Sequence, residues 1–144
     1  IATAVGMAWA SQLPTLAVIG DTAALHDLNT LALLQKTDTP VILIIINNGG
    51  GGIFSFLPIA DHKDLLDTYF ANAHSLRFDK AAALFGLPYY NATTAVELES
   101  HVKTAVKSKT SVVIEVLITH KHNLLAHQML AERCIQETES FFST

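Results

Sequence analysis

Two short apolar runs of the chain each end on side chains that could bind a metal ion. Asp21 follows the run TLAVIG, and Asn47 and Asn48 follow the run VILIII. Four glycines come next, at 49–52. Carboxylate, amide and backbone carbonyl oxygens are hard ligands, with no thiolate or clustered imidazole among them. This set predicts Mg²⁺ or Ca²⁺ rather than zinc.

The two runs have the pattern of neighbouring parallel strands. Short apolar segments rich in β-branched residues, such as 15–21 and 41–46, are typical of strands buried on both faces. The segment 22–37 between them has leucines at helical spacing, which predicts a helix. Because a strand–helix–strand crossover is right-handed, both strands end at the same edge of the sheet. We therefore expect Asp21 and the pair 47–48 to converge on one ligand outside that edge.

A diphosphate bound through magnesium is the ligand that these residues predict. Mg²⁺ takes six oxygens at about 2.1 Å and usually receives some of them from phosphate. The helix after Gly20 and Asp21 presents free N–H groups, which favour phosphate, and a glycine run lets backbone approach a ligand closely. Gly-Asp alone is typical of a helix N-cap, and Asn-Asn-Gly alone of a flexible loop. Their placement at two neighbouring strand ends favours the binding site, although neither the Walker pattern nor GxGxxG is present.

The remaining elements complete an α/β pattern. Helices are predicted at 1–12, 78–86, 95–109 and 123–142, and strands at 88–93 and 111–118. Thr94 can cap the helix 95–109, with Glu97 completing a capping box. Glu115, inside the last strand, is expected to be paired or to face the rim. Strands that alternate with helices predict an α/β fold, a doubly wound, mainly parallel sheet with helices on both faces.

Length and composition favour a single domain and argue against some partners. The chain has 144 residues, of which 50% are hydrophobic and 15% charged, and its net charge is −4. With no basic stripe, nucleic acid is not an expected partner, and the single cysteine excludes an internal disulfide. No apolar run approaches the roughly 18 residues of a membrane span, so none is expected. The chain opens on Ile1 in the middle of a helical pattern, which predicts a fragment of a longer protein.

The placement of Gly-Asp and Asn-Asn resembles the thiamine-diphosphate (ThDP) motif of ThDP-dependent enzymes. The fuller segments GDTAALHDLN (20–29) and NNGGGGIFSFLP (47–58) are similar to the C-terminal cofactor domain of the MenD family, the 2-succinyl-5-enolpyruvyl-6-hydroxy-3-cyclohexene-1-carboxylate synthases. The resemblance implies the ThDP-binding fold over residues 1–144, as a C-terminal ThDP- and magnesium-binding (PP-type) domain truncated on its N-terminal side. The features HDLN and GGxIFxxLP set this family apart from acetolactate synthases and related decarboxylases.

The resemblance also implies roles for residues of this chain. The Asp21 carboxylate, the Asn48 side chain and the Gly50 carbonyl would bind Mg²⁺ or Mn²⁺. Three residues around Asp21 would line the diphosphate: Gly20, Thr22 and Ala23. Three apolar residues would lie over the thiazolium ring and shape the substrate pocket: Ile53, Phe54 and Leu57. Thr22 stands where Gly or Ser is commoner, but its hydroxyl can still meet phosphate. No residue of this segment is assigned a catalytic role.

For the whole enzyme the resemblance implies a ThDP-dependent transferase of menaquinone or phylloquinone biosynthesis. Its cofactor would decarboxylate 2-oxoglutarate and add the succinyl carbanion to isochorismate. A glutamate from the N-terminal domain of a partner chain would activate the cofactor, so we expect a homo-oligomer (dimer or tetramer) and no activity from this segment alone. A cytoplasmic location is implied, or a plastid one for a plant or alga. The alternatives are another ThDP enzyme, such as a 2-oxoacid decarboxylase or acetolactate-type synthase, and a non-catalytic α/β module of the same fold.

Overall fold

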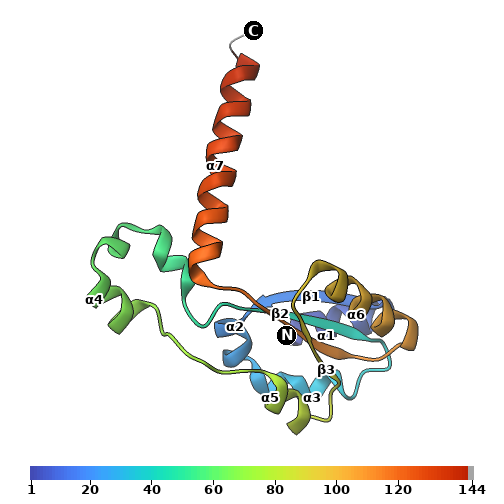
Figure 1. Cartoon of the computed structure of the whole chain (residues 1–144). Coiled ribbons are helices and arrows are strands. Elements are labelled where there is room, and N and C mark those ends of the chain that lie inside the picture. Colours follow the sequence, from blue (N-terminus) through green and yellow to red (C-terminus); the bar gives the residue numbers. More distant parts are fainter. Residues whose placement is uncertain (143–144) are drawn as a thin grey trace. The chain divides into compact units, whose positions relative to one another are not determined.

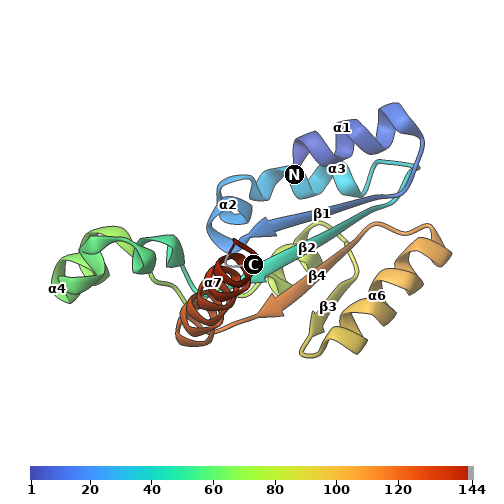
Figure 2. The same ribbon diagram turned by 90° about the horizontal axis from the view of Figure 1, so that it is seen from above.

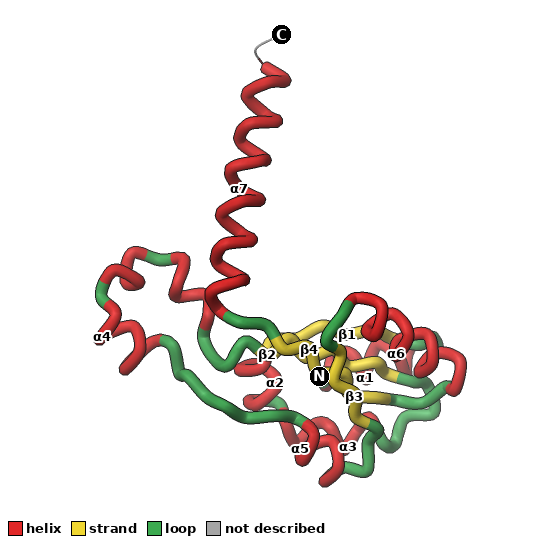
Figure 3. Tube along the Cα trace, viewed as in Figure 1, coloured by secondary structure: helices red, strands yellow, loops and turns green. Residues whose placement is uncertain are grey.

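The computed structural model of the chain describes residues 1–142 and divides into two compact units. The first unit comprises residues 1–50 and 74–117 and contains all of the strands (Figures 1 and 3). The second unit comprises residues 51–73 and the chain from residue 118 onwards, and it is helical. The candidate binding residues at the strand ends all belong to the first unit.

The first unit is built on a four-stranded parallel sheet. Its strands are β1 (Thr15–Gly20), β2 (Val41–Asn47), β3 (Tyr89–Ala92) and β4 (Val112–Leu117), in the spatial order β1-β2-β4-β3. Every neighbouring pair is parallel. The prediction of a parallel α/β sheet is therefore confirmed, with each strand close to its expected bounds.

Helices cover both faces of this sheet, as expected for a doubly wound fold. On one face, α1 (Ala2–Ser11), α3 (Leu31–Leu34) and α5 (Asp79–Leu84) contribute buried residues to one apolar cluster. On the other face, α6 (Ala95–Ser108) packs through Leu98, Val102 and Ala105. Figure 2 shows α1 and α3 on one side of the strands and α6 on the other. The two clusters together form the core of the unit.

The central and edge strands differ in burial. On β2, Val41, Leu43 and Ile45 face the first cluster and Ile42 and Ile44 the second, and none is more than 5% exposed. Burial on both faces is thus confirmed for β2.

The same expectation is wrong for β1, where exposure alternates along the strand. Leu16 and Val18 are 50% and 62% exposed. The physical reason is that α6, which covers their face of the sheet, packs over β2, β3 and β4.

The predicted helix 22–37 is interrupted. The structure has α2 (Asp21–His26), a 3₁₀ turn (Leu28–Thr30) and then α3. At the break, the backbone N–H and the hydroxyl of Thr30 both donate to the carbonyl of Asp27, at 3.0 and 2.5 Å. The Thr30 side chain thereby takes up a backbone carbonyl that a helix would use, and leucine spacing does not register that competition.

The caps of α6 agree with the sequence in part. The Thr94 hydroxyl accepts a hydrogen bond from the Glu97 N–H at 3.2 Å, as predicted. The Glu97 carboxylate accepts from the N–H and hydroxyl of Thr93, at 2.8 and 2.7 Å, rather than from Thr94. These bonds lower the pKa of Glu97, the Thr93 hydroxyl contributing most.

The second unit consists of short turns and one long helix. Two 3₁₀ turns (Gly52–Phe56 and Pro58–Asp61) lead into α4 (Lys63–Leu65) and a π-helical turn (Leu66–Phe70). The predicted C-terminal helix is α7 (His120–Phe142). Its described side chains are largely exposed, including Met129 and Ile135 at 69% and 58%. Within residues 1–142, no helix combines the length and the apolar character that a membrane crossing needs.

The burial of β2 predicts where the first unit is most sensitive to truncation. Leu43 is 0% exposed, so Leu43→Ala should lower the free energy of unfolding by about 3 kcal/mol through lost burial and a residual cavity. The matched control is Leu84→Ala, because Leu84 is 77% exposed and its truncation should cost less than about 0.5 kcal/mol. Urea denaturation measures both, and equal losses would contradict this account of the core.

Candidate active site

The carboxylate of Asp21 is the centre of the candidate site. Asp21 is the first residue of α2, directly after β1, and is 2% exposed. Its Oδ2 accepts hydrogen bonds from the backbone N–H groups of Asn48, Gly49 and Gly50, at 3.1, 2.8 and 3.0 Å. Its Oδ1 accepts from the N–H of Thr22 at 2.6 Å. The structure thus brings the end of β1 and the loop after β2 together around one carboxylate.

Strand register and glycine geometry make this arrangement possible. Gly20 pairs with Ile46, so β1 and β2 end side by side. Gly49 and Gly50 have φ angles of 79° and 135°, which side-chain-bearing residues rarely adopt. A Cβ at position 49 would also lie 3.1 Å from the carbonyl oxygen of His74. These glycines therefore let three successive N–H groups point at one oxygen.

The side-chain amide of Asn48 lies against two oxygens of the site. The end of the amide that faces them is 3.2 Å from Asp21 Oδ2 and 2.8 Å from the carbonyl oxygen of Gly50, and its nitrogen at that end can donate to both, whereas its oxygen would face a cation there. Six oxygens around Mg²⁺ at about 2.1 Å have neighbouring ligands about 3 Å apart, so this spacing fits three ligands on one cation. Without a cation the amide is satisfied only when turned over, because its nitrogen then donates to both oxygens. The donor set therefore has the chemistry and the spacing that a hard cation requires.

The other predicted cofactor residues border Asp21. Gly20 has an ordinary φ of −76°, and a Cβ there would meet nothing within 4 Å. Neither the backbone conformation nor packing within this chain thus explains a glycine at this position. The Thr22 hydroxyl lies 3.2 Å from Asp21 Oδ1, and Ala23 is exposed. The chain therefore leaves open space at Gly20, next to the residue that carries the carboxylate.

The three predicted pocket residues lie in the second unit. Ile53 and Leu57 are 69% and 47% exposed there. Phe54 packs edge-on against Phe70, with ring centroids 5.3 Å apart. Their role in shaping a substrate pocket stays a prediction.

His74 is a neighbour of Asp21 that the sequence did not indicate. Its Nε2 is buried, has no hydrogen-bond partner and lies 3.5 Å from Asp21 Oδ2. Its Nδ1 accepts from the N–H of Leu76 at 3.3 Å, which places the proton of a neutral ring on Nε2. The His74 N–H also donates to the carbonyl of Gly49 at 2.9 Å. The mixed pattern of 61–75 carries no signal for these contacts.

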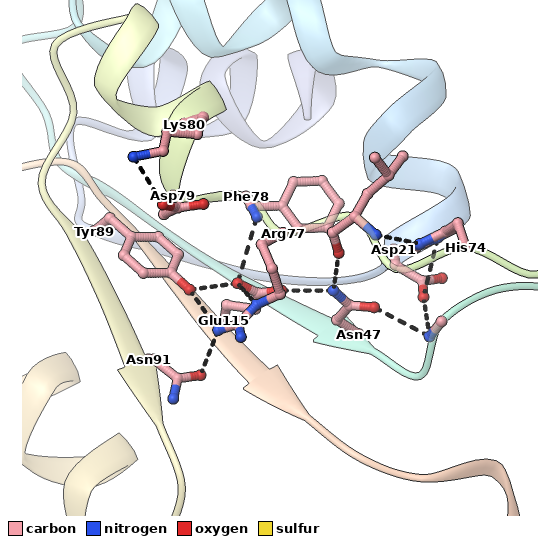
Figure 4. Close-up of polar contacts among 12 residues, drawn as sticks. Asp21, Asn47, His74, Arg77, Phe78, Asp79, Lys80, Tyr89, Asn91 and Glu115 are labelled. Atoms are coloured by element: carbon pink, nitrogen blue, oxygen red, sulfur yellow. Dashed lines mark hydrogen bonds and ion pairs between the residues drawn. The ribbon is translucent and has the colours of Figure 1, made fainter.

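A second polar group lies on the sheet beside the Asp21 loop. The sequence left open whether Glu115 is paired or faces the rim, and the structure shows it paired and 0% exposed. Both its oxygens lie 3.1 Å from Nε of Arg77, and the hydroxyl of Tyr89 and the N–H of Phe78 also donate to it. Its Oε1 accepts from Nδ2 of Asn47 at 2.5 Å. Figure 4 shows this network beside Asp21.

The hydrogen bonds of this network shift the pKa values of Tyr89 and Arg77. Burial raises the pKa of Tyr89, and its hydrogen bond to Glu115 raises the pKa further. The pKa of Arg77 is raised by its hydrogen bonds, first to Tyr89 and then to Glu115. Both shifts favour a neutral phenol and a charged guanidinium around the carboxylate.

The site has no cluster of the residues that bind transition metals. Within residues 1–142, nowhere do three His, Cys, Asp or Glu side chains gather in a way that could hold an ion. Cation binding at Asp21 would therefore depend on one carboxylate, one amide and one backbone carbonyl. Such oxygen sets suit Mg²⁺ or Mn²⁺ when phosphate supplies further ligands.

Comparison with curated proteins finds similarity to synthases of one name. It is 48% identical over 128 residues to 2-succinyl-5-enolpyruvyl-6-hydroxy-3-cyclohexene-1-carboxylate synthase of Syntrophus aciditrophicus, covering 89% of this chain and 22% of that protein. It is 45% identical over 140 residues to the synthase of the same name from Salinibacter ruber, covering 95% of this chain and 23% of that protein. The chain thus spans about a fifth of the length of these relatives.

Solved structures and a family model agree on the fold. The 4-hydroxybenzoylformate decarboxylase of Rhodococcus jostii, which is ThDP-dependent, superposes with a TM-score of 0.69 at 25% identity, over 81% of this chain and 22% of that chain. Benzoylformate decarboxylase from Polynucleobacter necessarius has a TM-score of 0.67 at 20% identity, with the same coverage, and so shows the fold alone. The model of the thiamine pyrophosphate (TPP, the same cofactor as ThDP) enzyme C-terminal domain matches residues 1–116. This chain belongs to the thiamine pyrophosphate enzyme family and carries its C-terminal TPP-binding domain.

Proposed function

We propose that this chain is the C-terminal, PP-type cofactor domain (1–144) of a MenD-type synthase. The whole enzyme would decarboxylate 2-oxoglutarate and transfer the resulting succinyl group to isochorismate, in menaquinone or phylloquinone biosynthesis. Relatives at 40–48% identity over most of the chain, all synthases of this one name, support the proposal. The sequence features HDLN (26–29) and GGGGIFSFLP (49–58) support the same choice within the family.

The observation that carries the cofactor assignment is the group of three oxygens. On this proposal Mg²⁺ or Mn²⁺ is held by the Asp21 carboxylate, the Asn48 amide oxygen and the Gly50 carbonyl. The end of the Asn48 amide that faces the site lies 3.2 Å from Asp21 Oδ2 and 2.8 Å from the Gly50 carbonyl oxygen, which is the spacing of neighbouring ligands on one cation. The diphosphate would supply further oxygens and lie beside Gly20, Thr22 and Ala23. At Gly20 the chain leaves space, since a Cβ there would meet nothing within 4 Å.

The residues of this chain hold and orient the cofactor rather than break bonds. When bound, ThDP supplies the nucleophilic carbon that removes CO₂ from a 2-oxo acid. Asp21 and its loop fix the charged end of the cofactor, and Ile53, Phe54 and Leu57 would keep water from its reactive ring. The glutamate that activates the cofactor would come from the N-terminal domain of a partner chain, in a homodimer or larger homo-oligomer.

Another ThDP enzyme is the alternative that a specific observation favours. One solved structure with this fold, at 25% identity, is a ThDP-dependent 4-hydroxybenzoylformate decarboxylase. A 2-oxoacid decarboxylase or acetolactate-type synthase would use the same cation site with a different acceptor. A non-catalytic module is less well supported, because Asp21 and Asn48 retain the contacts described above.

Removal of the central carboxylate tests the cation site. Asp21→Ala deletes one oxygen ligand and removes the acceptor of the Asn48 and Gly50 N–H groups, while the Gly49 N–H keeps only Asn47. We expect loss of Mg²⁺-dependent ThDP binding in the full-length protein, measured by isothermal titration calorimetry. Asp79→Ala is the control, since the Asp79 side chain is 42% exposed and lies on α5. Unchanged ThDP binding by Asp21→Ala would overturn the metal assignment.

The Asn48 amide should contribute to affinity without supporting the fold. Asn48→Ala should weaken ThDP binding about a hundredfold (about 3 kcal/mol), because it removes one hard ligand from a partly exposed loop. The melting temperature of the cofactor-free protein should stay near that of the wild type. Asn29→Ala, at an exposed position on the 3₁₀ turn, is the matched control. A lower melting temperature with unchanged affinity would contradict the prediction.

Product analysis separates the two enzyme assignments. The full-length protein, ThDP and Mg²⁺ should convert 2-oxoglutarate only slowly alone and rapidly with isochorismate, giving CO₂ and a succinyl-bearing product detectable by mass spectrometry. Pyruvate in place of 2-oxoglutarate is the control and should not react. Rapid turnover of pyruvate alone would support a decarboxylase or acetolactate-type enzyme instead.

A further inference from the structure

The buried carboxylate of Glu115 is not part of the proposed cation site, yet its contacts lead to it. Glu115 lies on β4, in register with Ile45 of β2 and Asn91 of β3, and is 0% exposed. Burying a carboxylate is costly unless hydrogen bonds and an opposite charge compensate for the lost water. Arg77, with a side chain 42% exposed, supplies that charge from the rim.

One consequence is that Glu115 fixes the orientation of Asn47. The Nδ2 of Asn47 donates to Glu115 Oε1 at 2.5 Å and to the carbonyl of Leu76 at 2.9 Å. Both neighbours are acceptors, so the amide nitrogen must face them and the amide oxygen must face the other way. Asn47 is 4% exposed, so water does not offer it an alternative.

The oxygen of Asn47 then holds the glycine loop. It accepts from the N–H of Gly49 at 3.1 Å, the same N–H that lies 2.8 Å from Asp21 Oδ2. The contacts therefore run without a gap from Glu115 through Asn47 and Gly49 to Asp21. Figure 4 shows the side chains of Glu115, Asn47 and Asp21. Gly49 is also the residue at which the loop turns, with φ at 79°.

The two adjacent asparagines therefore face different neighbours. The amide of Asn47 is locked by two acceptors on one side and one donor on the other. The amide of Asn48 meets two oxygens, and a cation decides which of its atoms faces them. A locked Asn47 keeps the backbone of the loop in place while Asn48 and the Gly50 carbonyl act as ligands.

We propose that Glu115, acting through Asn47, is a positioning residue that presets the glycine loop for the cation and diphosphate. The inference rests on the proposed ThDP function, because the affinity that it explains is that of the Mg²⁺–ThDP complex. Outer groups of metal sites that orient the ligands typically change affinity ten- to a hundredfold when removed. Glu115 and Asn47 are expected to act in the same range and through one path.

The test compares three variants of the full-length protein by calorimetry with Mg²⁺ and ThDP. Asn47→Leu and Glu115→Leu each break the path and should weaken ThDP affinity about tenfold or more. The double variant should be little weaker than either single one, because the two residues act in series. If Glu115→Leu alone does not fold, Glu115→Leu combined with Arg77→Leu removes both charges and replaces it in the comparison.

Tyr89→Phe is the matched control for a merely structural role. It removes the hydroxyl that donates to Glu115 and accepts from Arg77 at 3.1 Å, but leaves the bond to Asn47 intact. We expect it to lower the melting temperature while ThDP affinity stays within about twofold of the wild type. A fall in affinity as large as that of Asn47→Leu would show that general stability, not positioning, sets the affinity, and would overturn the proposal.

A readout without cofactor separates this inference from the proposed function. Amide hydrogen exchange of Gly49 in the cofactor-free protein should accelerate in Asn47→Leu and Glu115→Leu and stay slow in Tyr89→Phe. Unchanged exchange and unchanged affinity in the first two variants would refute the positioning role. A wild-type protein that binds no ThDP would instead refute the proposed function, while faster Gly49 exchange in those variants would still support the path from Glu115 to the loop.

Discussion

The contact on which the site depends is the one between a buried carboxylate and three successive backbone N–H groups. Asp21 Oδ2 accepts from residues 48, 49 and 50, and these bonds attach the loop after β2 to the end of β1. Hydrogen bonds to a charged acceptor are among the stronger ones in proteins, and here the acceptor is only 2% exposed. The parallel register of β1 and β2 brings the two ends together, and two glycines with positive φ shape the loop.

The loop at residues 48–50 is supported from two directions, which explains how the first two residues of a four-glycine run can form an ordered site. From one side Asp21 binds its N–H groups, and from the other Asn47 and His74 bind Gly49. Glycine loses more conformational freedom on ordering than any other residue, so such a loop needs several anchors. The anchors come from the first residue of α2, the end of β2 and the segment before α5, while Glu115 on β4 orients Asn47.

The sequence predicted the positions of the strands better than it predicted which helices cover them and which side chains contact one another. Apolar runs with β-branched residues predicted β1, β2 and β4, and β3 was expected from the short segment 88–93. The rule that parallel strands end at one edge predicted the meeting of Asp21 and Asn48. The prediction that β1 is buried on both faces was wrong, because an apolar run shows how hydrophobic a strand is but not which helix covers it. Leucine spacing missed the break at Asp27, where side-chain and 3₁₀ bonds compete with the helix. The sequence could not decide whether Glu115 is paired, because its partner Arg77 is 38 residues away along the chain.

The charge balance of the site bears on the order in which a cation and the cofactor would bind. On the proposed assignment, the chain offers one carboxylate and two neutral oxygens, so a bound Mg²⁺ keeps about one positive charge beyond what Asp21 neutralises. Asp21 Oδ2 is already engaged by three N–H groups, which weakens its attraction for a free cation. A diphosphate supplies the missing negative charge and further oxygens at once. Cation and cofactor should therefore bind together rather than in sequence, since neither charge is balanced by this chain alone.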